Sequence, residues 1–573
     1  MNRRNFIQYS GITSLLTTSG IFPIDFPLRG MLTDFNSFEE LVGFLVQLND
    51  ERVPELIQIQ EKNEDSENFG GLCDTWGIFN AGSTAGLITV LTISFTYPKS
   101  KYHLDKSLIT NIENAAKYLL KVQHSDGTID LMATNFHSTP DTAFVAEPLC
   151  ACFSLLQKAE FERKVEILSL LKQFLKRTGE AFIVGGVHTP NHRWVVSMAL
   201  ARLNSLFPDS RYVVRMEQWL QEGIDIDSDG QYEEKSTYIY SPLTNRCLVT
   251  IARLAGKAEL FEPVRKNLEM TSFYVHPNGE IATEASGRQD QTMVGFMENY
   301  YLPLRFMAIH DKNPLFSAMT KMVEKTVPEK LGGFLVYLLE SDFYNNELPA
   351  PSALPDSYIK EFPVSKLARI RRGNTDATIL ASNPSFFTLT KGNAVLAGIR
   401  MAAAFFGRGQ FKANKVEKSG DTFVLNWTFT WGYFQPFDNE QKPNYSIPFD
   451  EDRKRRRSSE RQTLNAVVTI VETNGNFELD FNVDGTNNVP LAVELIFRKG
   501  GKFSGVKGVK DTAESYLLGN ENATYCAGND CITFGPGNSE HSWTSIRGGL
   551  PKPDAPCVYI TGFTPFSRKI RIS

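Results

Sequence analysis

Apolar residues recur at the spacing of an amphipathic helix from about residue 36 to residue 330. The links between these runs are short and rich in Pro, Gly, Asn and Asp, and no strand-like alternation separates them. Such a succession predicts a layered all-α unit, either a solenoid or a closed ring of helical hairpins. The pattern predicts helices over 106–122, 143–157, 162–176, 192–206, 211–221, 242–255, 258–273 and 293–309.

The pattern changes near residue 368 to short segments in which apolar and polar residues alternate, such as FVLNWTFTW, AVVTIVET and FELDFNV. Gly, Asn and Pro interrupt these segments about every ten residues, which predicts an antiparallel β-sandwich. TNGN at 473–476 predicts a tight hairpin turn, because Asn and Gly tolerate a positive φ.

The Pro-rich, polar stretch 345–366 separates the two patterns and marks a domain boundary. We therefore predict an α+β multidomain chain. It consists of an export signal (1–28), a helical domain (29–350), a linker (351–367) and an antiparallel β-sandwich (368–573).

The first residues, MNRRNFIQYSGITSLLTTSGIFP, combine Arg3 and Arg4 with a modest apolar stretch that Ser and Thr dilute. This pattern is typical of an export signal of the twin-arginine type, and an ordinary basic N-terminus is the alternative. The apolar run is too short and too polar for a membrane span of about 20 residues. We expect the mature protein to lie in a bacterial periplasm.

The composition and net charge indicate a soluble globular protein and do not favour one that binds nucleic acid. Hydrophobic residues are 42% and charged residues 22% of the 573, which is ordinary for a soluble globular protein. The net charge of -5 gives no reason to expect a nucleic-acid partner. The basic run RKRRR at 453–457 predicts either a solvated loop or a contact to a sulfated or carboxylated polyanion.

The seven cysteines form no CxxC pair that would indicate zinc. Cys526 and Cys531 are close enough in sequence to bridge a hairpin in an oxidising compartment. Cys150, Cys152 and Cys247 lie in apolar helical patterns, and we expect them to be buried and inert.

The stretch GVHTPNHRWVV, 186–196, is a candidate active-site segment. Thr189 and Pro190 predict a helix start, with Thr as the cap, which places Asn191 and His192 in the first turn. The free N–H groups there favour an anionic ligand. The alternative is a polar helix start with a packed Trp. The candidate side chains of this segment are His188, Asn191, His192 and Arg193.

The stretch EGIDIDSDGQYEEKSTYIYSPLTNR, 222–246, predicts a shaped loop before a helix that starts near Pro242. Its phenols and carboxylates make Glu234, Tyr238 and Tyr240 candidates, and a purely structural loop is the alternative.

Two further segments supply candidate substrate-binding groups. TNFHSTPDTAF, 134–144, presents His137 and Asp141 before a helix that Asp141 alone would cap in the alternative interpretation. TEASGRQDQ, 283–291, presents Arg288 and Asp290, and Arg288 is suited to clamp a carboxylate with two hydrogen bonds. A surface salt-bridge loop is the alternative for the second segment.

Three of these stretches carry a resemblance. GVHTPNHRWVVSMALARLNSLFPD, EGIDIDSDGQYEEKSTYIYSPLTNRCLVTIARLAGK and HPNGEIATEASGRQDQ resemble the heparinase II/III-like group of carbohydrate-active proteins. The resemblance implies an (α/α) toroid followed by an antiparallel β-sandwich. It also implies action on glycans that contain uronic acid. Most members of the group are lyases, and related toroid proteins are exo-acting β-glucuronidases.

The resemblance also implies roles for residues. Asn191 would neutralise the uronate carboxylate, and His192 and Tyr240 would transfer protons, with Glu234 beside them as a further catalytic candidate. Many lyases of the group place a Tyr three residues after the Ser of an E-x-S pattern, but here that position is Ile239. The proton-transferring tyrosine is therefore Tyr238 or Tyr240.

Several reactions fit this picture. A 4,5-unsaturated uronate forms whether a glycan leaves, as in a polysaccharide lyase, or water leaves, as in an oligosaccharide dehydratase. The carboxylates leave a glycoside hydrolase open, and a periplasmic glycan-binding protein is the non-enzymatic alternative. The expected partner is a uronate-containing oligosaccharide or polysaccharide, and the basic run favours a sulfated, ulvan-type one. Homo-oligomerisation stays open.

No cofactor or metal site is predicted. His188 and His192 have HxxxH spacing, but Thr189 and Pro190 start the helix between them, so the two rings need not share a face. The sequence shows no phosphate-binding loop or dinucleotide fingerprint.

Overall fold

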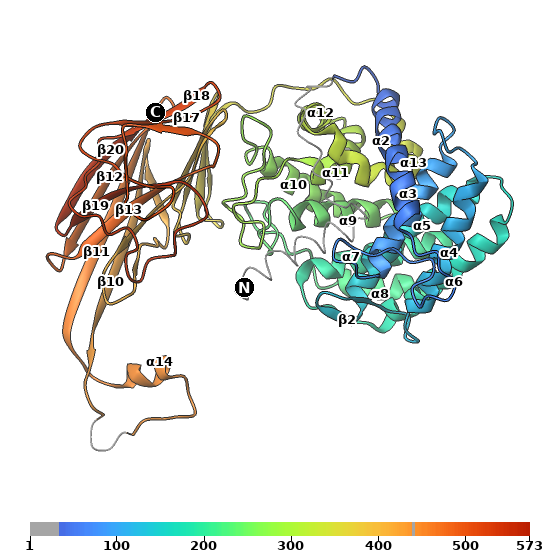
Figure 1. Cartoon of the computed structure of the whole chain (residues 1–573), viewed down its shortest axis with the longest axis horizontal. Helices are drawn as coiled ribbons and strands as arrows, with labels where there is room; N and C mark the ends of the chain where they lie inside the picture. Colours follow the sequence, from blue (N-terminus) through green and yellow to red (C-terminus); the bar gives the residue numbers. More distant parts are fainter. Residues whose placement is uncertain (1–33, 438–441) are drawn as a thin grey trace. The chain divides into compact units, whose positions relative to one another are not determined.

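A computed structural model describes residues 34–437 and 442–573. The described residues divide into two compact units: a helical unit that runs to Leu354 without 276–278, and a unit made of 276–278 and Pro355–Ser573 (Figure 1). The predicted export signal, 1–28, lies outside the described residues. Among the helices that are described, none is both long and apolar enough to cross a membrane.

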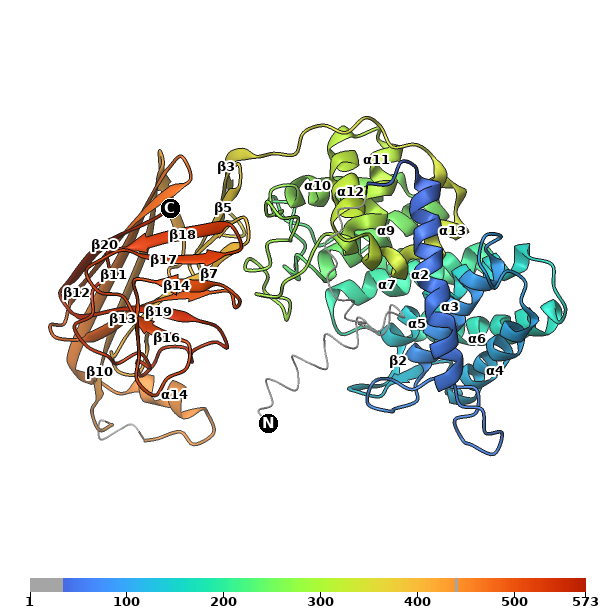
Figure 2. The same ribbon diagram turned by 45° about the horizontal axis from the view of Figure 1, so that its top comes forward.

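The helical unit is a toroid of two layers, as expected. Helices α3, α5, α7 and α9 pack side by side, while α4, α6 and α8 connect them in the other layer, where α6 packs against both α4 and α8 (Figures 1 and 2). Helix α13 packs against α2, α3 and α5. The α-helices are α2 (Phe38–Ile59), α3 (Ala81–Thr96), α4 (Lys106–Val122), α5 (Thr139–Lys158), α6 (Lys164–Val184), α7 (Pro190–Leu206), α8 (Ser210–Leu220), α9 (Tyr240–Ala255), α10 (Phe261–Thr271), α11 (Tyr301–His310), α12 (Pro314–Thr326) and α13 (Leu335–Glu340).

The helical periodicity located most of these helices, but it misplaced one start. The helix predicted over 293–309 begins at Tyr301, after a short 3-10 turn, η2 (Glu298–Tyr300). Residues before that turn form a loop, in which the Thr283 hydroxyl donates to the Met293 carbonyl and Glu280 pairs with Phe296. These contacts occupy backbone groups that a helix would use.

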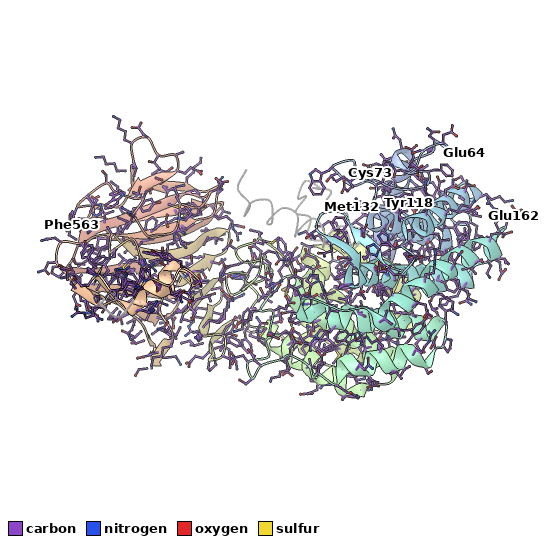
Figure 3. All side chains as sticks on the ribbon, turned by 90° about the horizontal axis from the view of Figure 1, so that it is seen from below. Glu64, Cys73, Tyr118, Met132, Glu162 and Phe563 are labelled. Carbon is purple, nitrogen blue, oxygen red and sulfur yellow. A yellow bond between two sulfur atoms is a disulfide. The ribbon has the colours of Figure 1, made fainter. Side chains whose placement is uncertain are left out.

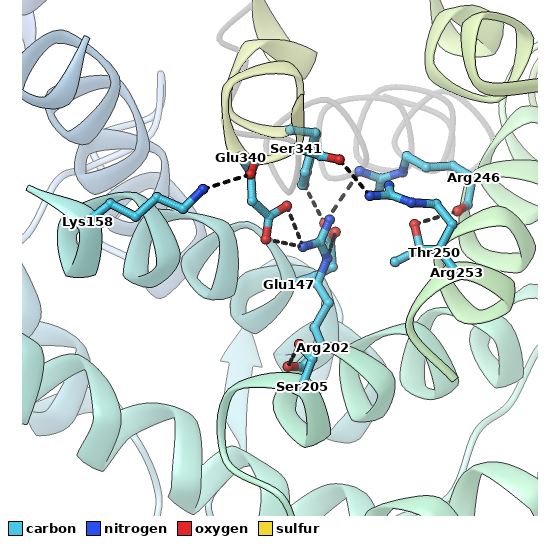
Figure 4. Close-up of polar contacts among 10 residues, drawn as sticks. Glu147, Lys158, Arg202, Ser205, Arg246, Thr250, Arg253, Glu340 and Ser341 are labelled. Carbon is cyan, nitrogen blue, oxygen red and sulfur yellow. Dashed lines mark hydrogen bonds and ion pairs between the residues drawn. The ribbon is translucent and has the colours of Figure 1, made fainter. Parts of the chain in front are cut away.

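Buried charges hold the centre of the toroid together. Glu147 of α5 accepts a 2.6 Å hydrogen bond from Arg202 Nε of α7, pairs with Arg246 of α9 and accepts from the Tyr337 hydroxyl of α13. Arg202 also donates to both carboxylate oxygens of Glu340 at 2.8 Å (Figure 4). We call Glu147, Arg202, Arg246, Tyr337 and Glu340 the central ion cluster.

The second unit is a β-sandwich of two sheets, as expected. Alternate residues face inward, and those of β10, β11 and β12 pack on those of β7 and β13 in one core. One sheet has the order β14-β17-β18-β20-β12-β11-β10-β9, and the other the order β15-β16-β19-β13-β7-β6-β5-β4-β3, with β8 beside β7. All pairs are antiparallel except β16 with β19. The strands are β3 (Ser357–Phe362), β4 (Leu367–Arg372), β5 (Thr375–Leu380), β6 (Phe387–Lys391), β7 (Ala394–Ala403), β8 (Gly409–Gln410), β9 (Val416–Ser419), β10 (Thr422–Phe434), β11 (Ser458–Thr473), β12 (Asn476–Gly485), β13 (Pro490–Phe497), β14 (Lys502–Ser504), β15 (Lys507–Gly508), β16 (Ser515–Leu517), β17 (Ala523–Ala527), β18 (Asp530–Gly535), β19 (Cys557–Phe563) and β20 (Phe566–Ile572).

Local signals in the sandwich have mixed outcomes. The predicted TNGN turn joins β11 to β12, and Asn474 and Gly475 have φ values of 49° and 81°. Strand β3 lies inside the predicted linker, 351–367, and pairs with β4. The prolines before β3 hid this strand, since its own alternation covers only six residues.

The cysteines follow the prediction. Cys526 of β17 and Cys531 of β18 face each other across the hairpin and form a disulfide. Cys150, Cys152 and Cys247 are buried in the helical unit, where Figure 3 also labels the half-buried Cys73.

Candidate active site

The first turn of α7 presents Asn191 to a carboxylate. Pro190 occupies the first helical position and Thr189 the cap position, as predicted, but the Thr189 hydroxyl makes no capping hydrogen bond to the helix backbone. Instead, the backbone N–H of Asn191 donates to Glu234 Oε1 at 3.2 Å, and its side-chain Nδ2 donates to the same oxygen at 2.6 Å. Glu234 therefore fixes the orientation of the Asn191 amide.

Arg288 balances the charge of Glu234. The Glu234 carboxylate is almost completely buried, and Arg288 Nε lies 3.3 Å from its Oε2. The Arg288 side chain keeps 38% of its surface exposed. A guanidinium with that much free surface can also bind a carboxylate that arrives from solvent.

Tyr240 is the first residue of α9, two residues earlier than the predicted start. Its backbone N–H donates to Ser236 Oγ at 3.0 Å, and its hydroxyl accepts a short hydrogen bond from Gln289 Nε2. The Arg288 guanidinium lies 5.4 Å from the centre of the Tyr240 ring. Burial raises the pKa of Tyr240, and the Gln289 hydrogen bond and the Arg288 charge oppose that rise.

Asp290 joins the two loops that surround Tyr240. Its buried Oδ2 accepts from Ser236 Oγ at 2.9 Å, from the Tyr238 backbone N–H at 3.0 Å and from Ser286 Oγ at 3.1 Å. The backbone N–H of Gly287 donates to the Lys235 carbonyl at 2.7 Å. These bonds fix the loop that carries Arg288 against the loop that precedes α9.

His192 lies beside this group with its ring partly covered. The ring centroid lies 4.6 Å from that of His188 and 6.2 Å from that of Phe144. Burial, together with the charges of His188 and Arg288, lowers the pKa of His192 to about 3. The imidazole is therefore neutral near pH 7, and its low pKa makes it a weak base. Asn191, His192, Glu234, Tyr240, Arg288 and Gln289 are hereafter the Tyr240 cluster.

Among the described residues, two polar atoms of the Tyr240 cluster are buried without a hydrogen bond or an ion pair, whereas Glu234 Oε2, which also lacks a hydrogen bond, is ion-paired with Arg288. Asn191 Oδ1 and His192 Nδ1 make no hydrogen bond within the described part of the chain. Buried polar atoms are almost always hydrogen-bonded in folded proteins, and exceptions gather at functional sites. Asn191 and Tyr240 also lie in the first turns of the neighbouring helices α7 and α9, whose positive N-terminal ends favour an anion.

The low pKa of His192 predicts an acid-sensitive fold. Between pH 6.5 and about 3 the unfolded chain binds a proton at His192 and the folded chain does not, so stability falls as pH falls. We expect the free energy of unfolding to decrease less over this range in a His192→Gln variant than in the wild type. Urea titrations at pH 7, 5 and 4 measure this difference. Parallel pH dependence in the two proteins would contradict the neutral, buried imidazole.

The structure places two predicted residues outside the Tyr240 cluster. The Tyr238 hydroxyl donates to Glu298 at 2.9 Å, and burial raises its pKa. Arg193 pairs with Glu222 at 2.8 Å and with Asp225 at 3.3 Å. Both side chains are thus engaged in contacts that fix the loops.

The segment before α5 also lies outside the Tyr240 cluster. Asp141 was expected to cap α5 in the alternative interpretation, but Ser138 is the cap, and Asp141 Oδ2 accepts from the Ser138 hydroxyl and from Asn135. His137 is half exposed, pairs with Asp126 at 2.6 Å and stacks on His124 with ring centroids 3.7 Å apart. None of these measured contacts joins His137 or Asp141 to the Tyr240 cluster.

In the described ranges, no three His, Cys, Asp or Glu side chains are grouped so that they could hold a metal ion. The rings of His188 and His192 meet edge to face, with centroids 4.6 Å apart.

Sequence reasoning missed Gln289. It lies between Arg288 and Asp290, which were both candidates, but a glutamine in a polar loop carries no signal of its own. Only the folded loop brings its amide to the Tyr240 hydroxyl.

Comparison with known proteins defines the fold. No family model and no curated protein sequence matches the chain. Solved structures do match: heparinase III has a TM-score of 0.55 at 12% identity, over 99% of this chain and 89% of that one. The chain has the fold of this enzyme. A xanthan lyase from Paenibacillus has a TM-score of 0.57 at 11% identity, over 100% of this chain and 59% of that one.

A third match is the chondroitin AC lyase of Streptomyces coelicolor A3, which was solved in complex with chondroitin sulphate. Its TM-score is 0.55 at 11% identity, over 99% of this chain and 82% of that one. The helical toroid with a β-sandwich that the sequence resemblance implied is therefore confirmed as a fold.

Proposed function

We propose that this protein is a carbon–oxygen lyase that acts by β-elimination on uronic acid residues of an oligosaccharide or polysaccharide. The Tyr240 cluster is the observation that carries the proposal. It combines the oriented amide of Asn191 and the partly exposed guanidinium of Arg288 with the phenol of Tyr240, which accepts a hydrogen bond from Gln289. The shared fold supports it, since the three matched structures bear the names of enzymes that act on glycans.

The chemistry requires three tasks. The carboxylate at C5 must be neutralised so that the C5 proton becomes acidic, a base must take that proton, and the oxygen leaving C4 must receive one. The second N–H of the Asn191 amide, whose contact with Thr189 Oγ1 is 3.5 Å long, and the exposed part of Arg288 would hold the carboxylate. Arg288 also offsets the charge of Glu234, which would otherwise repel the substrate.

Proton transfer would run through Tyr240. Its phenolate oxygen takes the proton from C5, the electron pair forms the C4=C5 double bond, and the bond from C4 to the leaving oxygen breaks. The new hydroxyl of Tyr240 then protonates that oxygen, which restores the phenolate. His192 is the other proton-transfer candidate, but its pKa of about 3 makes it a much weaker base than the phenolate.

The leaving group distinguishes two versions of the reaction. If a sugar leaves from C4 the enzyme is a polysaccharide lyase, and if water leaves from a chain end it is an oligosaccharide dehydratase. The basic run at 453–457 favours a sulfated substrate such as an ulvan fragment. The twin-arginine N-terminus favours a periplasmic site of action.

The decisive experiment incubates the purified mature protein with uronate-terminated oligosaccharides and follows ultraviolet absorbance together with product mass. Rising absorbance with chain cleavage means polysaccharide lyase, and rising absorbance with loss of one water means dehydratase. Release of free saturated glucuronate without a rise in absorbance would mean that the enzyme is a hydrolase and not a lyase. Hydrolysis needs two facing carboxyl groups, whereas the Tyr240 cluster contains one, Glu234.

A further inference from the structure

The Tyr240 hydroxyl is hydrogen-bonded to Gln289, a residue that has no role in the proposed reaction. Gln289 Nε2 donates a short hydrogen bond to the phenolic oxygen, and the Gln289 side chain is itself partly buried. A phenolic oxygen has one proton to donate and lone pairs to accept with. When a lone pair is occupied by Gln289, the hydroxyl proton must point elsewhere.

We propose that Gln289 is a positioning residue for Tyr240, which directs the hydroxyl proton toward the substrate and stabilises the phenolate that removes the C5 proton. The inference rests on the proposed function and assigns a residue that carries no catalytic group of its own. Gln289 would act through Tyr240 and make no contact with the sugar.

The charges around Tyr240 make such a donor necessary. Burial of the ring and the negative charge of Glu234 both disfavour the phenolate, and Arg288, 5.4 Å from the ring centroid, favours it. Arg288 also pairs with Glu234, whose negative charge offsets part of the stabilisation that the guanidinium gives to the phenolate. Gln289 donates the stronger of the hydrogen bonds that lower the pKa of Tyr240, and the bond from Arg288 is the weaker one.

The loop architecture holds Gln289 in place. Its neighbour Asp290 is completely buried and is bonded to Ser236, to the Tyr238 backbone and to Ser286. Ser236 in turn accepts the backbone N–H of Tyr240. One bond network therefore fixes the backbone on both sides of the bond between Gln289 and Tyr240, so the distance does not depend on a mobile side chain alone.

The test measures the ionisation of Tyr240 without substrate. Carbon-13 label at the tyrosine Cζ gives one resonance per tyrosine, and the resonance absent from Tyr240→Phe identifies this residue. Removing a hydrogen bond to a charged oxygen shifts a pKa by about one unit or more. We expect Gln289→Leu to raise the pKa of Tyr240 by that amount, and Gln289→Glu, which places a negative acceptor there, to raise it further.

Activity gives a second readout. In Gln289→Leu we expect kcat to fall about tenfold with KM unchanged, and the acid limb of the pH profile to move up with the pKa of Tyr240. Gln291→Leu is the matched control, because Gln291 is an exposed glutamine of the same loop. It should leave both the pKa and the profile as in the wild type.

The outcomes separate the inference from the proposed function. An unchanged Tyr240 pKa in both Gln289 variants overturns the inference, as does a Gln289→Glu variant with wild-type activity, which would mean that the side chain accepts rather than donates. Shifted pKa values in a protein that produces no unsaturated uronate would support the hydrogen bond and reject the lyase. Circular dichroism checks that each variant is folded.

Discussion

A Tyr240→Phe variant should fold as the wild type does and lose about 10²- to 10⁴-fold in kcat, which is the usual contribution of a positioned acid–base group. The change removes one oxygen from a ring that stays packed under Arg288. It removes both the acceptor for the C5 proton and the donor to the leaving oxygen. Initial rates of unsaturated uronate formation at saturating substrate measure the loss, and KM should change little.

Tyr238→Phe is the discriminating comparison. The sequence offers Tyr238 and Tyr240 as proton-transfer candidates. In the structure the Tyr238 hydroxyl donates a hydrogen bond to Glu298, which lies outside the Tyr240 cluster. The expected kcat of Tyr238→Phe is within a few-fold of the wild type. A larger loss in Tyr238→Phe than in Tyr240→Phe would reverse the assignment.

A Glu147→Gln variant should lose about 3–5 kcal/mol of stability in the helical unit, because it leaves buried arginines without their partner. Glu147 neutralises Arg202 and Arg246 (Figure 4). It also accepts a hydrogen bond from Tyr337, and all of these side chains are largely buried. Denaturant titration followed by the helical circular dichroism signal measures the loss in the full-length chain.

Glu162→Gln is the control for that prediction. Glu162 pairs with Lys106 at 3.0 Å, but more than two thirds of each side chain is exposed. Exposed ion pairs contribute about 0–1 kcal/mol, so this variant should unfold close to the wild type. If the two variants lost similar stability, the central ion cluster would not be what connects α5, α7, α9 and α13.

Much of the fold could be predicted because its signals are local. The helix over 106–122 was located to the residue, and the Asn-Gly turn between β11 and β12 needed only two residues to specify it. Strand β3 and the late start of α11 were missed, because one is short and flanked by prolines and the other depends on contacts with distant loops. Tertiary contacts, not propensity, decide such segments.

The site was predictable to the same extent. Asn191, His192, Glu234, Tyr240 and Arg288 could be proposed because each belongs to a polar stretch at a predicted helix start or loop. Which of them meet could not be read from spacing, since Glu234 reaches Asn191 across 43 residues and Gln289 reaches Tyr240 across 49. Buried loop contacts also explain why Arg193 and Tyr238 are engaged elsewhere.

The central ion cluster and the Tyr240 cluster share helices but not positions along them. Arg202 follows Asn191 by eleven residues of α7, a rise of about 16 Å at the usual 1.5 Å per residue. The Tyr240 cluster thus lies at the first turns of α7 and α9 and in the adjoining loops, while the central ion cluster lies deeper in the same helices. Substitutions in the Tyr240 cluster therefore leave the ion pairs of Glu147 and Arg202 intact, so a loss of activity there can be separated from a loss of stability.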